Sequence, residues 1–180
     1  LAELLELYEK EFIDEGYESA EHKMERFEAG KQALTRYVGE YKERLGKPWR
    51  LEQSFRLKLA GVALVGKIDR IDVVEGSYEI VDYKTGSLQK KSQVDKDEQL
   101  SVYALAAHEA LGVETEKQSL YFLEDGEKIS TSRSEEQLKK KRRDLEGVIE
   151  QMKDSGFPAK PGFHCQFCEF NRICPFAEKV

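Results

Sequence analysis

The sequence has no apolar run near the roughly 18 residues that a membrane-spanning helix needs, and its first residues do not form a signal-peptide pattern. A cytoplasmic protein without a membrane partner is therefore the default expectation. An excess of positive charge is also missing, because the formal net charge is −6. This argues against unspecific binding of polyanions, which depends on clustered Lys and Arg, but it is compatible with an acidic metal site.

Cysteine is scarce, and the 3 cysteines, Cys165, Cys168 and Cys174, all lie near the end of the chain. Such a local group is not a disulfide framework. The spacing C-x2-C-x5-C suits a metal centre, because two residues between ligands allow a tight turn around one ion. Zinc and iron–sulfur clusters normally take four protein ligands, and His164 is poorly placed as the fourth because it adjoins Cys165. The alternative is three thiols in a segment that packs aromatic residues.

Apolar periodicity divides the chain into helical and strand-like parts. Residues 1–45 show apolar residues at three- and four-residue spacing, which predicts one or two packing helices with Gly46 and Pro48 as stop signals. Alternating patterns predict three consecutive antiparallel strands, at 49–61, 62–74 and 77–86.

The second half of the chain continues with mixed elements. A polar loop at 87–96 precedes a predicted helix at 97–112 and a strand with a hairpin at 117–132. Ser134 and Gln137 form a capping box for a last helix. This order predicts an α/β domain with a mixed sheet.

Three parts of the chain are expected: an N-terminal helical segment at 1–48, a core at 49–160 and a cysteine-containing end at 161–180. The first residue, Leu1, already belongs to an amphipathic pattern, so we expect a segment upstream of it.

The third predicted strand carries charge where the chain turns. In "YEIVDYKTGS", Asp82 and Lys84 are two residues apart and therefore point to the same face of a sheet. Asp69, in "GKIDRID" of the preceding strand, can lie across the hairpin from them. Two carboxylates suit Mg²⁺, and a nearby lysine suits metal-assisted hydrolysis of a phosphodiester. The alternative is an ordinary Asp82–Lys84 salt bridge, with Asp69, Arg70 and Asp72 on a solvated strand face.

Further residues are candidates for the same site. Glu52 on the first strand is a possible extra carboxylate, although a lone strand Glu is usually exposed. Gln99 and Tyr103 are four residues apart on a predicted helix and share a face, from which they could hold the lysine or a phosphate. Basic residues in the loop after the charged strand are candidates for contact with DNA, and they are better placed than the run "KKKRR": Lys90, Lys91 and Lys96.

In this order, "GKIDRID", "VDYKTG" and "QLSVY" resemble the G-x-x-D, D-x-K and Q-x-x-x-Y motifs of the PD-(D/E)XK nuclease superfamily, specifically its RecB-type branch. The cysteine spacing followed by Pro175 is similar to the C-terminal part of the iron–sulfur staple of AddB-type nucleases. The resemblance covers roughly residues 50–176. It implies a restriction-endonuclease-like core, in which helices flank a mixed sheet.

The resemblance also implies roles for single residues. Asp69, Asp82 and the backbone carbonyl of Tyr83 would hold Mg²⁺ or Mn²⁺, and Glu52 would match the family's strand glutamate. Lys84 would be the catalytic lysine. Gln99 and Tyr103 would form the supporting motif around it.

The implied protein is a metal-dependent DNase that acts on DNA ends or single strands. Its implied partner is a helicase domain or subunit of a larger DNA-repair protein. A 4Fe–4S cluster would need a first Cys in an upstream segment, which is not identifiable here, so the cluster is expected only in a full-length protein. Two alternatives stay open: a nuclease-like DNA-binding or scaffold domain with an incomplete metal site, and a zinc-ribbon-like interaction module.

Overall fold

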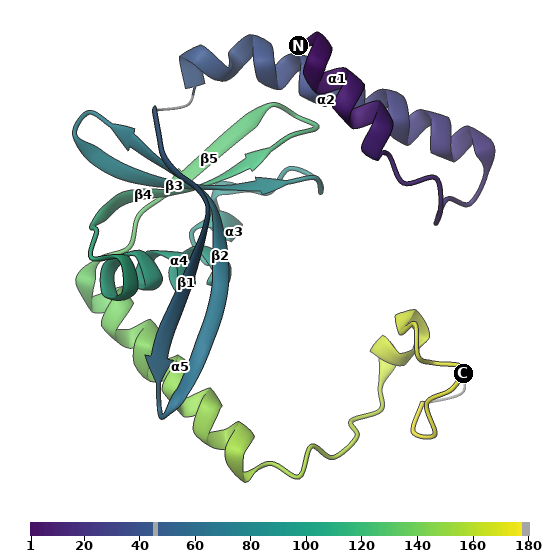
Figure 1. Cartoon of the computed structure of the whole chain (residues 1–180). Coiled ribbons are helices and arrows are strands. Elements are labelled where there is room, and N and C mark those ends of the chain that lie inside the picture. The colour runs from purple at the N-terminus through teal and green to yellow at the C-terminus, as the bar shows by residue number, and fades with distance from the viewer. Residues whose placement is uncertain (45–46, 178–180) are drawn as a thin grey trace.

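The computed structural model describes residues 1–44 and 47–177. Its centre is one 5-stranded sheet in the order β1-β2-β3-β4-β5. The strands are β1 (Lys47–Leu59), β2 (Val62–Val74), β3 (Ser77–Lys84), β4 (Thr115–Phe122) and β5 (Glu127–Thr131). Only β3 and β4 are parallel among these neighbours, because the chain crosses over between them through helices. The mixed sheet flanked by helices confirms the predicted α/β fold (Figure 1).

Helices cover both faces of the sheet. The N-terminal pair α1 (Ala2–Glu11) and α2 (Ala20–Arg44) lies on one side, and α4 and α5 lie on the other (Figure 1). The crossover from β3 to β4 contains three helical pieces: α3 (Lys91–Val94), α4 (Glu98–Ala106) and the π-helical turn η1 (Ala107–Leu111). The chain ends with α5 (Glu135–Asp154) and the 3₁₀ turn η2 (Phe163–Phe167).

Two tight turns join the first three strands. Ala60 and Gly61 have φ of 46° and 80°, and Glu75 and Gly76 have φ of 52° and 85°. Left-handed φ at both positions of a two-residue loop matches the right-handed twist of a hairpin. The predicted antiparallel pairing of the three strands is confirmed.

The edge strand begins earlier than its pattern indicated. β1 starts at Lys47 and includes Pro48, whereas the sequence placed Pro48 among the stop signals before a strand at Trp49. Because β1 is an edge strand, a proline without an N–H is tolerated there. The other predicted stop signal, Gly46, lies outside the described residues.

The crossover differs from its prediction in detail. The segment 87–96 contains the single turn α3 rather than only a loop, and the helix predicted at 97–112 ends in the π-helical turn η1. Gly112, with φ of 68°, ends that turn as the pattern predicted. The capping box of α5 is confirmed, since Ser134 accepts from the Gln137 N–H and Gln137 accepts from the Ser134 N–H.

The apolar core lies between the sheet and the helices α4 and α5. One cluster joins β1 and β2 to α4, and a smaller one joins α3 and α4 to β4. The fully buried members include Leu59, Ile68, Ile71, Ile80, Leu105, Leu100, Leu120 and Phe122. These side chains fix α4 against the sheet, and α4 carries Gln99 and Tyr103. Among the residues that the structure describes, no helix has the length and apolarity needed to cross a bilayer.

Candidate active site

The two predicted carboxylates meet where β2 and β3 end their pairing. The last β2–β3 pair in this direction is Arg70 with Val81. Beyond this pair, the Tyr83 backbone N–H donates to Asp69 Oδ2 at 3.0 Å instead of to a backbone carbonyl. A side chain therefore replaces the sheet ladder here, and it brings the Asp69 carboxylate to the end of β3.

The Tyr83 carbonyl shares this position. In a strand, the N–H and C=O of one residue point to the same neighbour. The Lys84 carbonyl accepts from the Leu123 N–H at 2.9 Å, on the β4 side, so the preceding residue faces β2 and Asp69. The Tyr83 carbonyl therefore points toward the Asp69 carboxylate, as it must if both are to bind one metal ion.

Asp82 is a buried carboxylate beside Lys84. Its side chain is only 3% exposed, and Lys84 Nζ lies 2.7 Å from its Oδ2 as an ion pair. Within the described residues, however, that oxygen accepts no hydrogen bond of good geometry. Burial raises the pKa of Asp82 above its ordinary value, the Lys84 contact opposes this, and the charge of Asp69 adds to it.

Lys84 is held from a second side by α4. Its Nζ donates to Gln99 Oε1 at 2.6 Å, and Gln99 Nε2 donates to the Tyr103 hydroxyl at 2.8 Å. Both oxygens that Lys84 contacts are thus fixed, one by the sheet and one by α4. The predicted helix face of Gln99 and Tyr103 therefore lies against the predicted lysine.

The donor set fits a hard divalent cation. Asp82 Oδ2 is a buried carboxylate oxygen without a well-formed hydrogen bond, which is a costly arrangement unless another group neutralises it. Mg²⁺ takes one or two carboxylates and keeps several waters, so Asp69, Asp82 and a backbone carbonyl are a sufficient protein contribution.

Four predicted site residues have exposed side chains: Glu52 and the lysines Lys90, Lys91 and Lys96. Glu52, with a left-handed φ of 49°, lies opposite Asp69 in the β1–β2 register but forms an exposed ion pair with Lys67 at 3.3 Å. Its role as a ligand stays a prediction. The candidate DNA-binding residues are exposed on α3 and the turns around it, where Lys91 pairs with Asp95. The remaining two are Lys90 and Lys96.

The cysteine segment does not form a preformed metal centre. Cys165 is buried, Cys168 is exposed and Cys174 is intermediate, and all are free thiols. Within residues 1–44 and 47–177, no group of three or more His, Cys, Asp or Glu side chains is arranged to hold a metal ion. The segment extends away from the sheet (Figure 1) and exposes its aromatic side chains, with Phe163 and Phe167 at 72% and 75%. The residues present therefore do not fit an iron–sulfur cluster in this chain.

The opposite face of the sheet is polar and buried, which the sequence interpretation missed. Arg70 and Asp72 form an ion pair at 2.6 Å with side chains 3% and 0% exposed, so the alternative of a solvated strand face is wrong for them. The Tyr83 hydroxyl lies 2.7 Å from the hydroxyl of Tyr37 on α2. The strand that carries the site is therefore anchored from behind by α2, and no local pattern in the sequence pairs residues 46 positions apart.

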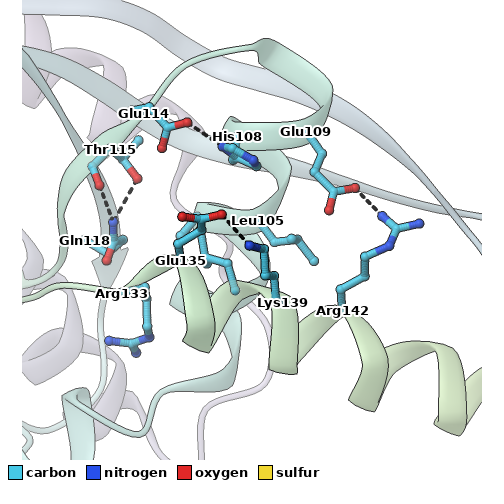
Figure 2. A pocket seen from close by; sticks show the side chains of 12 residues that line it. Leu105, His108, Glu109, Glu114, Thr115, Gln118, Arg133, Glu135, Lys139 and Arg142 are labelled. Carbon is cyan, nitrogen blue, oxygen red and sulfur yellow. Dashed lines mark hydrogen bonds and ion pairs between the residues drawn. The ribbon is translucent and has the colours of Figure 1, made fainter.

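A cavity of about 440 Å³ lies at the other end of α4, between η1, the start of β4 and α5 (Figure 2). Ion pairs line its rim, including Glu135 with Lys139 and Glu109 with Arg142. None of Asp69, Asp82 and Lys84 lines it. The carboxylate site is thus separate from this cavity.

Two curated phage proteins are similar to this chain over most of its length. The "Gene 69 protein" of Mycobacterium phage D29 is 32% identical over 135 residues, which make up 69% of this chain and 47% of that protein. The "Gene 69 protein" of Mycobacterium phage L5 is 30% identical over 134 residues, or 69% of this chain and 44% of that protein. The chain thus spans about half the length of the curated relatives it matches.

A solved structure from Eubacterium rectale, provisionally named an exonuclease, aligns with 100% of this chain and 70% of its own at a TM-score of 0.57. At 16% sequence identity, this likeness shows the fold alone. A sequence model of the PD-(D/E)XK nuclease superfamily matches residues 1–175. Because that match covers nearly the whole chain, including both carboxylates and the lysine, the protein belongs to the PD-(D/E)XK nuclease superfamily.

Proposed function

We propose that the chain is a Mg²⁺- or Mn²⁺-dependent deoxyribonuclease module that hydrolyses phosphodiester bonds at DNA ends or in single strands. The observation that carries the proposal is the Asp82–Lys84 ion pair at 2.7 Å, beside a carboxylate that is bonded to the Tyr83 backbone. A purely structural salt bridge does not need a second carboxylate. The charge of the half-buried Asp69 beside the buried Asp82 raises the cost of the arrangement.

Each residue has a chemical task in this proposal. Asp69, Asp82 and the Tyr83 carbonyl would hold the metal ion, which would polarise the phosphate and lower the pKa of a bound water. Lys84 stabilises charge that develops on the phosphoryl oxygens and orients the attacking water. Gln99 fixes the direction of the ammonium by accepting its hydrogen bond at 2.6 Å.

We further propose a RecB-type module within a longer protein that also supplies a helicase domain or subunit. The matched relatives are about twice as long as the part that this chain covers, which supports a larger parent. Exposed lysines on and around α3, next to the end of β3, are the proposed phosphate contacts. A 4Fe–4S cluster stays a prediction for the longer protein, tested by absorbance near ~400 nm in an anaerobic preparation.

Cleavage of linear single- and double-stranded DNA tests this proposal. We expect cleavage with Mg²⁺ or Mn²⁺, none with EDTA, and a loss on the order of 10²-fold or more in Lys84→Ala. Lys139→Ala is the matched control, because Lys139 forms an exposed ion pair with Glu135 on α5. Absence of cleavage in the wild type would leave the nuclease-like scaffold as the better description. Equal cleavage in Lys84→Ala would contradict the assignment of the reaction to this site.

A further inference from the structure

Arg133 lies between β5 and α5, and every nitrogen of its guanidinium group donates hydrogen bonds within the protein. Its Nε donates to Ser101 Oγ at 2.9 Å. Its Nη1 donates to Thr131 Oγ1 at 2.8 Å and to the Ser132 carbonyl at 3.0 Å. Its Nη2 donates to the carbonyls of Asp97 at 3.1 Å and Val94 at 3.4 Å. A guanidinium has five N–H donors, so each of them has a partner.

Two of these contacts grip the first turn of α4. Asp97 is the N-cap of that helix, and its Oδ1 accepts from the Leu100 N–H at 2.7 Å. Ser101, one turn further, donates to the Asp97 carbonyl at 2.8 Å while it accepts from Arg133. The guanidinium thus joins both ends of the turn.

Gln99 lies in the middle of the same turn. Its Oε1 accepts from Lys84 at 2.6 Å, which is the hydrogen bond that directs the ammonium. Asp97 and Ser101, which lie two positions before and two positions after Gln99, are therefore both held by the planar guanidinium of Arg133. A shift of this turn moves the Gln99 amide relative to the sheet.

We propose that Arg133 is a positioning residue for the nuclease site, which holds the first turn of α4 so that Gln99 directs Lys84. This inference rests on the function proposed above. A phosphate contact is excluded for the same guanidinium, because all of its donors already have partners within the protein. Figure 2 shows that the Arg133 side chain, among those that line the cavity, is directed away from Glu135 and Lys139.

The chemistry of arginine suits this task better than that of lysine. Burial lowers the pKa of Arg133, but a guanidinium still keeps its charge, and its planar fork holds several acceptors in fixed directions. A lysine at this position has three donors on a flexible stem and can replace only some of these hydrogen bonds.

Three proteins test the proposal beside the wild type: Arg133→Ala, Arg133→Lys and the control Arg143→Ala, which removes an exposed arginine of α5. In cleavage assays we expect kcat to fall on the order of 10- to 100-fold in Arg133→Ala and less in Arg133→Lys. The affinity for DNA, measured with Ca²⁺, should stay within about twofold, because the guanidinium binds no phosphate. Weaker DNA binding with unchanged kcat would overturn the proposal.

A double-mutant cycle separates positioning from a merely stabilising role. The double variant Arg133→Lys with Gln99→Ala should cleave DNA only a little more slowly than Gln99→Ala alone. The reason is that the amide that Arg133 positions is already absent in Gln99→Ala. If the fold-losses of kcat in the two single variants multiply in the double variant, Arg133 acts on something other than Gln99, and the proposal is overturned. Arg133→Lys retains the charge, so this cycle does not depend on the alanine variant being folded.

Hydrogen exchange keeps this test independent of catalysis. Amides of residues 97–103 should exchange at least tenfold faster in Arg133→Ala or Arg133→Lys than in the wild type or Arg143→Ala. If the wild type cleaves no DNA but this difference is seen, the proposed function fails and the anchoring stands. If the wild type cleaves DNA and exchange in this segment is unchanged, the anchoring itself is wrong.

Discussion

Replacing Asp82 by Asn should stabilise the metal-free protein while it removes activity. The side chain is 3% exposed, and its Oδ2 is buried without a well-formed hydrogen bond. Burial is the largest cause that raises the pKa of Asp82, the charge of Asp69 adds to it, and the Lys84 contact opposes it. Since the net effect disfavours the charged form in the folded state, a neutral amide of the same shape relieves the protein of that cost.

The size of the effect follows from comparable substitutions. Single stabilising substitutions commonly add about 0.5–2 kcal/mol to stability. In a domain of this size, 1 kcal/mol shifts Tm by about 2–4 °C. We therefore expect Asp82→Asn to melt a few degrees above the wild type at pH 7 in EDTA. Asp144→Asn, which alters an exposed ion pair with Lys140 at 3.5 Å, is the matched control.

The difference should depend on pH with a definite sign. The pKa of Asp82 is raised on folding, so the unfolded chain ionises first and the wild type loses stability as pH rises. Wild type and Asp82→Asn should therefore melt alike below the ordinary carboxyl pKa of about 3.9 and separate above it. The assay is thermal unfolding by circular dichroism from low to neutral pH. A lower Tm for Asp82→Asn at pH 7, or a gap that closes as pH rises, would refute the reasoning.

Two other substitutions probe the framework around the site. A Cβ added at Gly66 would lie 2.5 Å from Phe55 Cζ, so Gly66→Ala should lower stability by about 1–3 kcal/mol in denaturant unfolding. Asp72→Ala removes the carboxylate that pairs with Arg70 at 2.6 Å inside the protein, and should cost about 3–5 kcal/mol in the same assay. An unchanged denaturation midpoint would show that the Phe55 ring moves aside without cost in Gly66→Ala, or that the Arg70 guanidinium does so in Asp72→Ala.

Local patterns predicted the strands and the charged pair because both depend on short-range geometry. Alternation along β3 places Asp82 and Lys84 on one face, and a two-residue turn brings β2 alongside, so Asp69 follows from the register. The four-residue spacing of Gln99 and Tyr103 likewise predicts that they share a helix face, and the structure adds a hydrogen bond of 2.8 Å between them.

The supports of the site could not be predicted in this way. Arg133 meets Ser101 across 32 positions and Tyr37 meets Tyr83 across 46, and the contact in each case depends on how whole elements dock. The turn α3 was missed because four residues carry too little periodicity to distinguish a helix from a loop. The burial of Asp72 also could not be predicted from a local pattern, because it depends on helices covering both faces of the sheet.

Metal binding tests most directly whether Asp69 and Asp82 form one centre. Titration with Mn²⁺ by calorimetry or electron paramagnetic resonance needs no DNA and no cleavage. We expect the wild type and Asp144→Asn to bind Mn²⁺ alike, and Asp69→Asn and Asp82→Asn each to weaken it about tenfold or more, because each removes a charged oxygen ligand. Equal affinity in all four proteins would contradict the assignment of the metal site to these two carboxylates.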